Sequence, residues 1–447
     1  MVVRVHHGAE AGRAAVLARR ELRDAELSPR MREGVRRVFG ADLTADEVVQ
    51  RILADVRTDG DAALIRYTEQ IDGVRLDAVE VSRSELQAAH EAVAPEVIAA
   101  LETAAARIRR FHERQHIDPW IDVQPEGVLG QLVVPLERVG VYAPGGTAPY
   151  PSSLLMTAIP ATVAGVGEVV VCAPPERDGQ IAPVTAVAAQ IAGAARVFRV
   201  GGAQAIGAMA FGTESVPRVD KILGPGNIFV VLAKRQVYGE VAIDALPGPT
   251  ETVLIADESA SAVLCAADML AQAEHDPMAS AILLTTSSEL ARQVEAELER
   301  QLRPLSRASV ARESLAANGA IVVVDSLDEA FDIANAYAPE HLCLLLADPW
   351  AWAPAVRHAG GIFLGESSPE VLGDYTAGPS HVMPTGRTAR FSSPVNVADF
   401  VKIISVIGLN ERGLRELGPA AARIARAEGL TAHAAAVERR LELLRPD

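Results

Sequence analysis

Short β-branched runs alternate with alanine-rich windows from about residue 139 onward, and this alternation constrains the fold more than any other feature. The pattern predicts strands at 168–172 and 196–200 and helices at 181–193 and 203–211. Strand-length apolar runs that alternate with helical windows are typical of βαβ units, whose helices cover both faces of a parallel sheet. We therefore expect an α/β fold.

A second alternation of the same kind begins after Leu246-Pro-Gly-Pro249, which breaks the first. Apolar spacing between residues 10 and 115, and beyond about 395, is helical instead. The sequence thus predicts two α/β units in tandem, flanked by helical N- and C-terminal segments and without a repeat of fixed period. In the second unit, strands are expected at 252–256, 281–285, 320–324, 341–346 and 361–364, and helices at 261–275, 288–301 and 327–337.

The composition is that of a globular protein and argues against nucleic-acid and membrane partners. Of 447 residues, 49% are hydrophobic and 22% are charged, which is ample for large buried cores. The formal net charge is -16, and lysine and arginine form no stripe. Apolar runs are too short to cross a bilayer, and the N-terminus lacks an apolar signal core. Three cysteines without a CxxC pair further favour a reduced, cytoplasmic protein.

Four separated side chains are candidates for a metal shell. Gln272 and His275 stand three residues apart on an expected helix and so share one face. Asp374 lies in a loop flanked by glycines, and His433 lies one turn into the last helix. Taken singly, they are explained as well by a solvated helix face, an Asx turn and a surface histidine. Taken together, they could complete the coordination of one divalent cation.

Glu340 and His341 are a sharper candidate for chemistry, because Pro339 fixes the backbone just before them. Imidazole has the side-chain pKa nearest neutrality, about 6.5, and a carboxylate beside it can activate water while the ring relays protons. The alternative is a buried histidine that its neighbour neutralises. His381 lies in a loop constrained by prolines and glycines and is a candidate ligand contact.

Glycine pairs at 145–146 and 201–202, and the run Gly224-Pro-Gly-Asn227, mark turns where the backbone could approach a phosphate. None matches the Rossmann dinucleotide fingerprint, because Phe229 stands at the third glycine position of the nearest candidate. Ordinary strand-to-helix turns remain the alternative. The turns alone therefore do not predict a dinucleotide-binding site.

An ordered set of motifs carries a family resemblance over roughly residues 139–435. The motifs are Val139-Gly-Val-Tyr-Ala-Pro-Gly-Gly146, Gly201-Gly-Ala-Gln-Ala205, Gly224-Pro-Gly-Asn227, Gly248-Pro-Thr-Glu251, Gln272-Ala-Glu-His-Asp276, Tyr337-Ala-Pro-Glu-His-Leu342, Leu372-Gly-Asp-Tyr375, Ser380-His-Val-Met-Pro-Thr385 and Glu428-Gly-Leu-Thr-Ala-His433. In this order they closely resemble the histidinol dehydrogenases, which complete histidine biosynthesis. The residues upstream of 139 match that family only in their helical pattern.

The resemblance implies one Zn2+ per subunit, held by Gln272, His275, Asp374 and His433. It also implies that Glu340 and His341 are the catalytic pair. By the same resemblance, Tyr142, Gln204 and Asn227 contact NAD, and the substrate contacts are Thr250, Gln272, His275, His341, Asp374, His381, Glu428 and His433. Two departures from the family stand out: Thr250 replaces a common serine, and Cys343 and Leu344 stand where an acidic residue is common.

The activity that the resemblance implies is a four-electron oxidation of L-histidinol to L-histidine through histidinaldehyde, with two NAD reduced. A related zinc and NAD dehydrogenase of another small alcohol, such as a sulfonated diol, is the nearest alternative. A zinc hydrolase without NAD is disfavoured by the matched NAD positions, and an inactive scaffold by the intact Glu340–His341 pair. The family is homodimeric, so His433 and Glu428 are expected to act in the neighbour's active site.

The resemblance also implies two incomplete Rossmann-like units, one inserted in the other. We expect residues 1–35 to form an N-terminal helical segment. Residues 36–138 with 250–395 are expected to form the first unit, which carries most zinc and catalytic residues. Residues 139–249 are expected to form the inserted unit with the NAD contacts, and 396–447 a C-terminal helical segment that reaches the partner's active site.

Overall fold

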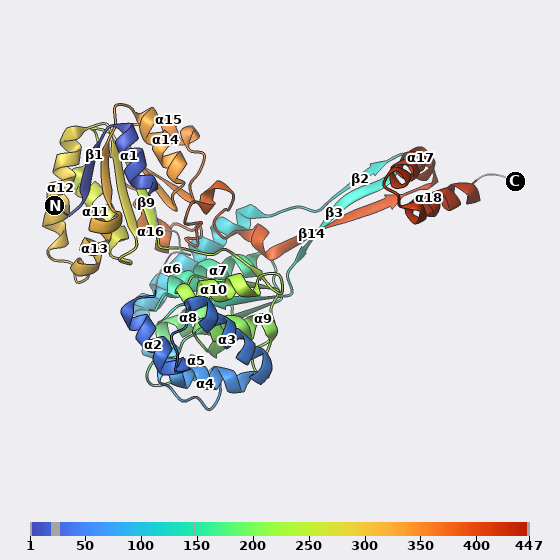
Figure 1. Ribbon diagram of the computed structural model, residues 1–447, viewed down its shortest axis with the longest axis horizontal. Coiled ribbons are helices and arrows are strands. Elements are labelled where there is room, and N and C mark those ends of the chain that lie inside the picture. The colour runs from blue at the N-terminus through green and yellow to red at the C-terminus, as the bar shows by residue number, and fades with distance from the viewer. Residues whose placement is uncertain (1, 19–26, 146–148, 445–447) are drawn as a thin grey trace.

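Two α/β lobes and a projecting arm make up the computed structural model, which describes residues 2–18, 27–145 and 149–444. Figure 1 shows the lobes beside each other and the arm extending away from both, with the C-terminal helices at its tip. Each lobe contains one parallel sheet, and the arm contains an antiparallel one.

The first lobe is built on a six-stranded sheet in the order β1-β11-β10-β9-β12-β13, with every neighbouring pair parallel. Every residue of β9, β11 and β12 is buried, because helices cover both faces of the sheet. The strands are β1 (Arg4–His7), β9 (Glu251–Ala256), β10 (Ser280–Thr285), β11 (Ala320–Val323), β12 (His341–Leu345) and β13 (Gly361–Leu364), and the helices are α1 (Ala9–Leu17), α11 (Ala262–Ala273), α12 (Ser288–Leu302), α13 (Ala308–Asn318), α14 (Leu327–Tyr337), α15 (Pro349–Trp352) and α16 (Glu370–Tyr375).

The second lobe is built on a five-stranded parallel sheet in the order β6-β5-β4-β7-β8. Its hydrophobic clusters also lie on both faces of the sheet. The strands are β4 (Arg138–Tyr142), β5 (Glu168–Ala173), β6 (Arg196–Arg199), β7 (Lys221–Leu223) and β8 (Ala242–Ile243), and the helices are α2 (Pro29–Phe39), α3 (Ala45–Asp59), α4 (Asp61–Asp72), α5 (Arg83–Ala92), α6 (Pro95–His112), α7 (Pro151–Val163), α8 (Pro183–Ala192), α9 (Gly202–Phe211) and α10 (Ile228–Val237).

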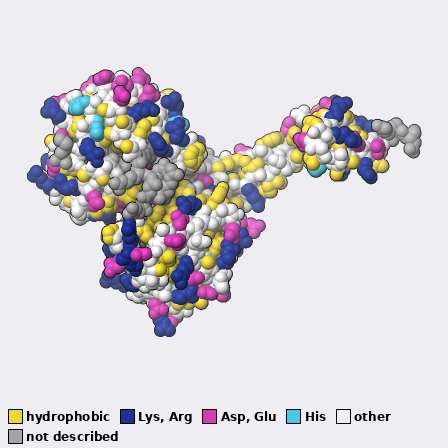
Figure 2. All heavy atoms as spheres, in the orientation of Figure 1, with side chains coloured by type: hydrophobic (Ala, Val, Ile, Leu, Met, Phe, Trp, Pro, Cys, Tyr) yellow, Lys and Arg dark blue, Asp and Glu magenta, His cyan; other side chains and the backbone are white. Residues whose placement is uncertain are grey.

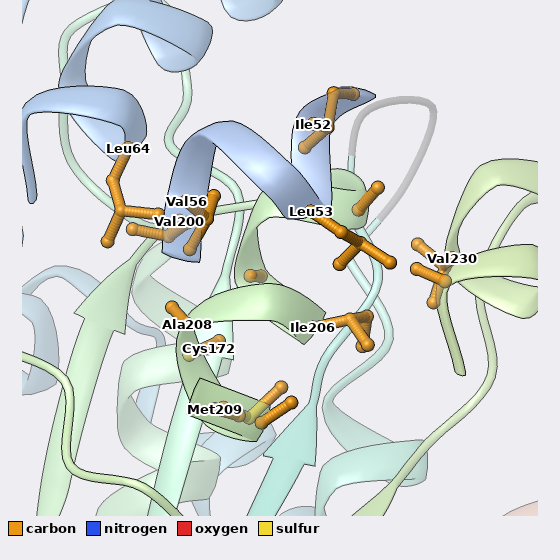
Figure 3. Close-up of a cluster of buried hydrophobic side chains, with 14 of the residues drawn as sticks. Ile52, Leu53, Val56, Leu64, Cys172, Val200, Ile206, Ala208, Met209 and Val230 are labelled. Carbon is orange, nitrogen blue, oxygen red and sulfur yellow. The ribbon is translucent and has the colours of Figure 1, made fainter. Parts of the chain in front are cut away.

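The N-terminal helices pack on the five-stranded sheet, whereas we expected residues 36–138 to join the six-stranded one. Leu53 and Val56 of α3 share a buried cluster with Ile206 of α9 and Val230 of α10, and Figure 3 shows these side chains facing one another. Helices α5 and α6 cover the other face, against α7 and α8. The apolar period of a helix identifies its buried face, but the sheet that receives this face depends on tertiary packing.

The first lobe begins with β1, so the chain enters its sheet, leaves to build the second lobe and returns at β9. The expectation of one unit inserted in the other is therefore confirmed, although the insertion starts near residue 28 rather than at 139. The expected 1–35 helical segment contains strand β1, which pairs with β11 from Arg4 to His7. Its sequence, Arg-Val-His-His, contains one apolar residue and therefore no apolar run or alternation that indicates a strand.

The arm is a three-stranded antiparallel sheet of β2 (Trp120–Gln124), β3 (Gly127–Pro135) and β14 (Val401–Leu409), capped by α17 (Glu411–Ala427) and α18 (Thr431–Leu443). The expected all-helical 396–447 segment is therefore wrong over β14. The strand escaped detection because neither face of the arm is buried in this chain: Val123 is 74% and Ile407 73% exposed. Figure 2 shows apolar side chains along this arm.

Glu85 of α5 is expected to stabilise the second lobe. Its carboxylate accepts hydrogen bonds from the Ser82 backbone N–H and from Arg199, a buried side chain, each at 2.7 Å. Burial of Glu85 opposes its ionisation, but these hydrogen bonds lower its pKa to about 2. We predict that Glu85→Gln lowers the free energy of unfolding by about 2 kcal/mol at pH 7, because Arg199 loses its charged partner.

The effect should depend on pH in one direction. Since the folded pKa lies below the ordinary value of 4.5, the stabilisation is complete above that value and fades as the pH falls toward 2. Urea unfolding of wild type and variant at pH 7 and at about pH 3.5 measures the difference. Glu102→Gln, at an exposed carboxylate of α6, is the control. An unchanged difference at the two pH values would contradict this account.

Candidate active site

The six-stranded sheet presents Glu340 and His341 at its amino edge. His341 is the first residue of β12, and Glu340 directly precedes it. Thr250 directly precedes β9, the neighbouring strand. Helix α11 runs back from the carboxyl end of β9, so its last turn brings Gln272 to the same edge. Three segments far apart in sequence therefore converge on one side of the sheet.

A chain of hydrogen bonds orients these side chains. Thr250 Oγ1 donates to Glu340 Oε2 at 2.6 Å, and the Glu251 backbone N–H donates to the same oxygen at 3.1 Å. Gln272 Nε2 donates to Thr250 Oγ1 at 2.8 Å. Glu340 is buried, and burial raises its pKa above the ordinary value, while His341 and Thr250 oppose that rise. A carboxylate of raised pKa, held in one orientation, is suited to act as a base.

His341 lies between two carboxylates. Its Nδ1 is 3.9 Å from Glu340 Oε2, and its Nε2 is 3.6 Å from Asp374 Oδ1, just beyond hydrogen-bond length. Both ring nitrogens are buried and have no hydrogen-bond partner among the described residues. Burial alone would lower the pKa of His341, but the charge of Glu340 and the proximity of Asp374 raise it to about 10. The two carboxylates therefore stabilise a proton on the ring.

Asp374 lies in α16, a short helix, rather than in the loop that we expected. Burial opposes its ionisation, but His341, His381 and His275 lower its pKa below the ordinary range. His381 Nδ1 lies 2.6 Å from the Asp374 carbonyl oxygen, which can only accept, so Nδ1 carries the proton. His381 Nε2 then accepts from the Ser153 hydroxyl at 3.0 Å.

Ser153 belongs to α7 of the other lobe, so the His381–Ser153 hydrogen bond joins the two lobes at the site. Ser380 Oγ also donates to the Met156 carbonyl oxygen of α7 at 3.0 Å. Since α7 follows β4, its first turn lies at the carboxyl edge of the five-stranded sheet. The amino edge of one sheet therefore faces the carboxyl edge of the other.

Three of the four expected metal ligands lie on the first lobe. Gln272 is buried, and Asp374 is close to His341. His275 is exposed and lies two residues beyond the end of α11, although we expected that helix to extend to residue 275. His433, in α18, is exposed on the arm, which Figure 1 shows projecting away from both lobes. Within the described ranges, no group of three His, Cys, Asp or Glu side chains forms a metal cluster.

The expected NAD contacts surround the carboxyl edge of the five-stranded sheet. Tyr142 ends β4, and its hydroxyl accepts from the Gly202 backbone N–H at 3.1 Å. Asn227 Oδ1 caps α10, where it accepts from the Phe229 N–H at 3.0 Å. Gln204 is buried, and neither atom of its amide has a hydrogen-bond partner in the described part of the chain. An unsatisfied buried amide is costly, which supports a polar ligand at this edge.

The sequence analysis missed a buried ion pair that holds Gly224 in place. Lys234 and Asp244 pair with each other, and both are almost fully enclosed. Lys234 Nζ donates to the Gly224 carbonyl oxygen at 3.0 Å, and the Gly224 N–H donates to Asp244 Oδ2 at 2.8 Å. Gly224 has φ of 115°, and a Cβ there would lie 2.2 Å from the Tyr142 carbonyl oxygen, so only glycine fits. A lysine directly after the six apolar residues that begin α10 was the available signal.

Glu370 was also missed. It is 2% exposed, accepts from the Thr252 hydroxyl and lies near enough to His341 for their charges to interact. Burial raises the pKa of Glu370 to about 7. Glu370 directly follows Pro369, in a segment to which the sequence pattern assigned neither helix nor strand, so it carried no sequence signal of burial.

An acid/base pair on one Rossmann-like lobe, facing glycine-rich turns on another, defines a two-lobed oxidoreductase. Comparisons with known proteins agree with this class and identify one family within it. The family model described as histidinol dehydrogenase matches residues 37–441, and the chain belongs to that family.

Individual relatives agree. The histidinol dehydrogenase of Deinococcus radiodurans is 58% identical, over 91% of this chain and 93% of that protein. That of Thermus thermophilus is 53% identical, over 91% and 97%. The crystal structure of histidinol dehydrogenase from Elizabethkingia anophelis superposes with a TM-score of 0.91 at 34% identity and covers 99% of both chains. The expected family and fold class are therefore confirmed.

The Lys234–Asp244 pair provides a test of how the Gly224 turn is held. Lys234→Met leaves Asp244 charged and buried, so we predict a loss of about 3–5 kcal/mol in the free energy of unfolding. In the double variant Lys234→Met/Asp244→Asn no lone charge remains, and the loss should be smaller than the sum of the single losses. Lys402→Met, at an exposed lysine of β14, is the control. Additive losses in urea unfolding would show that the two side chains act independently.

Proposed function

We propose that this chain catalyses the zinc-dependent, NAD-linked oxidation of L-histidinol to L-histidine through histidinaldehyde. The observation that carries the proposal is the buried Glu340–His341 pair beside Gln272, His275 and Asp374, in a chain of the histidinol dehydrogenase family. The overall change removes four electrons from the alcohol carbon, adds one water oxygen and requires two successive hydride acceptors.

His341 accepts the alcohol proton in the first oxidation. Glu340 and Asp374, on either side of the ring, stabilise the imidazolium that forms. After it releases this proton to solvent, the same ring takes up another in the second oxidation, when the hydrated aldehyde loses its hydride. NAD, when bound, supplies the hydride acceptor for each oxidation.

Glu340 activates the water that attacks the aldehyde. Thr250 and the Glu251 N–H both donate to Oε2, and no described hydrogen bond reaches Oε1. That second oxygen is available to take the water proton as the hydrated aldehyde forms. The raised pKa of the buried carboxylate strengthens it as a base.

The donor set of the first lobe fits a zinc ion. Because Glu340 can only accept, Thr250 must donate to it and accept from Gln272 Nε2, which leaves Gln272 Oε1 free to face a cation. The carboxylate of Asp374 and the imidazole of His275 supply an oxygen and a nitrogen donor. Zinc, when bound, would grip and orient the nitrogen donors of the substrate.

The fourth zinc ligand, His433, and the substrate contact Glu428 would come from a partner subunit in a homodimer. Both are exposed at the end of the arm, whose strands and helices leave apolar side chains such as Ile407 and Ile424 uncovered. Apolar surface of this kind on a projecting element is typical of an intersubunit contact. The proposal thus pairs one subunit's arm with the other subunit's site.

We also propose that the enzyme works in the cytoplasm. The three cysteines are free and buried, as is usual in a reducing compartment. Among the helices that the structure describes, none has the length and apolarity needed to cross a membrane.

Replacing the proposed water-activating base separates the two oxidations. We predict that Glu340→Gln slows oxidation of histidinaldehyde by about a hundredfold or more, whereas alcohol oxidation, which loses part of the charge that stabilises the His341 imidazolium, slows by about tenfold or less. Stopped-flow NADH traces with histidinol and with histidinaldehyde measure the two steps. His341→Asn, the comparison variant, should slow both steps, and elemental analysis should show that Glu340→Gln retains its zinc. An equal loss in both steps would remove Glu340 from this role.

Mixing two variants that form no histidine tests the shared site, with histidine formation as the measured activity. Glu340→Gln blocks histidine formation at the site on its own chain, whereas His433→Ala blocks it at the site of the partner. After equimolar mixing and subunit exchange, heterodimers contain one intact site, so activity should return to about a quarter of wild type. If each site is built from one chain, the mixture stays inactive. Mixing Glu340→Gln with Asp374→Ala is the control. Both changes fall on the first lobe, so each site of the heterodimer contains one damaged lobe and no activity should return.

A further inference from the structure

A hollow at the carboxyl edge of the five-stranded sheet contains a carboxylate that the proposed mechanism does not use. The hollow has a volume of about 600 Å³, within the range of small-molecule sites. Its floor includes Gly145, after β4, and Pro174, after β5, and Asp72 from the end of α4 lies in its wall. The carboxylate in this hollow therefore comes from α4 and not from a turn that follows a strand of the sheet.

Asp72 lacks the partner that a buried carboxylate oxygen requires. Its Oδ2 is enclosed and has no hydrogen-bond partner in the described residues. Burial raises the pKa of Asp72 to about 6, and burial is the sole cause of that shift. An unsatisfied buried carboxylate costs free energy, which a ligand that donates hydrogen bonds would recover.

The hollow adjoins the expected NAD contacts. The charge of Asp72 interacts with Tyr142, whose hydroxyl accepts from Gly202. Pro174 lies so close to Gly145 and Gly201 that a Cβ on either glycine would approach it to 2.7 or 2.6 Å. The glycine turns, Tyr142 and Asp72 therefore line one continuous edge.

The other charged groups of the hollow are less suited to hold a ligand hydroxyl. Glu176 and Asp178 are exposed, and Asp178 already accepts from the Gln180 N–H at 3.0 Å. Arg177, the one basic side chain in the wall, is exposed as well. Acidic groups outnumber basic ones, which disfavours an additional phosphate in this hollow.

We propose that Asp72 accepts hydrogen bonds from the adenosine ribose hydroxyls of NAD and thereby excludes NADP. In Rossmann folds, an acidic side chain commonly binds the ribose 2′-hydroxyl and repels a 2′-phosphate, and it usually follows the second strand. In this chain that position belongs to Glu176, which is exposed, so helix α4 supplies the carboxylate instead. The inference rests on the proposed function, since it assumes that NAD is the cofactor.

Nucleotide binding to the full-length, zinc-loaded protein tests the proposal without a turnover assay. Isothermal titration with NAD and NADP gives the dissociation constant of each for wild type, Asp72→Asn and Asp72→Ala. We expect Asp72→Ala to weaken NAD by about tenfold or more, because a charged hydrogen-bond acceptor is lost. Asp72→Asn should lower the preference for NAD over NADP by a similar factor, because the asparagine does not repel the 2′-phosphate.

Two controls locate the effect. Glu69→Gln removes an exposed carboxylate from the same helix and should leave both constants unchanged. Nicotinamide mononucleotide lacks the adenosine half, so its affinity should be the same in wild type and both Asp72 variants. Thermal unfolding of each variant shows whether a change in binding reflects loss of fold, and the isosteric Asp72→Asn keeps the test usable if the alanine variant is unstable.

The outcomes separate this inference from the proposed function. If wild type binds neither nucleotide, the NAD proposal itself fails. If wild type binds NAD but Asp72→Asn keeps the NAD to NADP ratio within about twofold, Asp72 does not set the preference. If Glu176→Gln, and not Asp72→Asn, changes the ratio, the carboxylate after β5 has that role. A loss of nicotinamide mononucleotide binding in the Asp72 variants would overturn the assignment to the adenosine ribose.

Discussion

Two parallel sheets meet at opposite edges, and the site depends on this contact. The six-stranded sheet contributes the starts of β9 and β12, whereas the five-stranded sheet contributes the ends of β4 and β6 and the turns that follow. Ligands of open α/β sheets usually bind at carboxyl edges. In this chain that rule holds for the expected nucleotide contacts alone, and the acid/base pair comes from an amino edge. The His381–Ser153 hydrogen bond joins the two edges directly.

One hydroxyl determines the orientation of the proposed catalytic carboxylate and of a proposed metal ligand. Thr250 has a single proton, which goes to Glu340, so its oxygen must accept from the Gln272 amide. The direction of both hydrogen bonds follows from the carboxylate of Glu340, which can only accept. Serine or threonine can make the same two hydrogen bonds in this position, since both provide the hydroxyl.

The sequence predicted most strands of the two parallel sheets and missed those of the arm. The expected strand 341–346 is β12 to within one residue, because an enclosed strand requires a continuous apolar run. β14 and β2 expose apolar side chains to solvent in a single chain, so their patterns do not alternate as half-buried strands do. The resemblance of the motifs to those of histidinol dehydrogenases indicated candidate site residues in both lobes. It did not reveal Glu370, Ser153 or the Lys234–Asp244 pair.

What the sequence by itself determined is local: the order of strands and helices, the buried face of each helix, and the residue types at each candidate position. It placed Glu340 and His341 after a proline at the start of a strand, and the structure keeps them there. Tertiary structure alone decided which sheet receives the N-terminal helices and which edges meet. Glu251 and Glu340 are 89 residues apart, and Ser153 and His381 are 228 apart. Contacts over such separations depend on how whole elements pack, and no short-range period in the sequence encodes them.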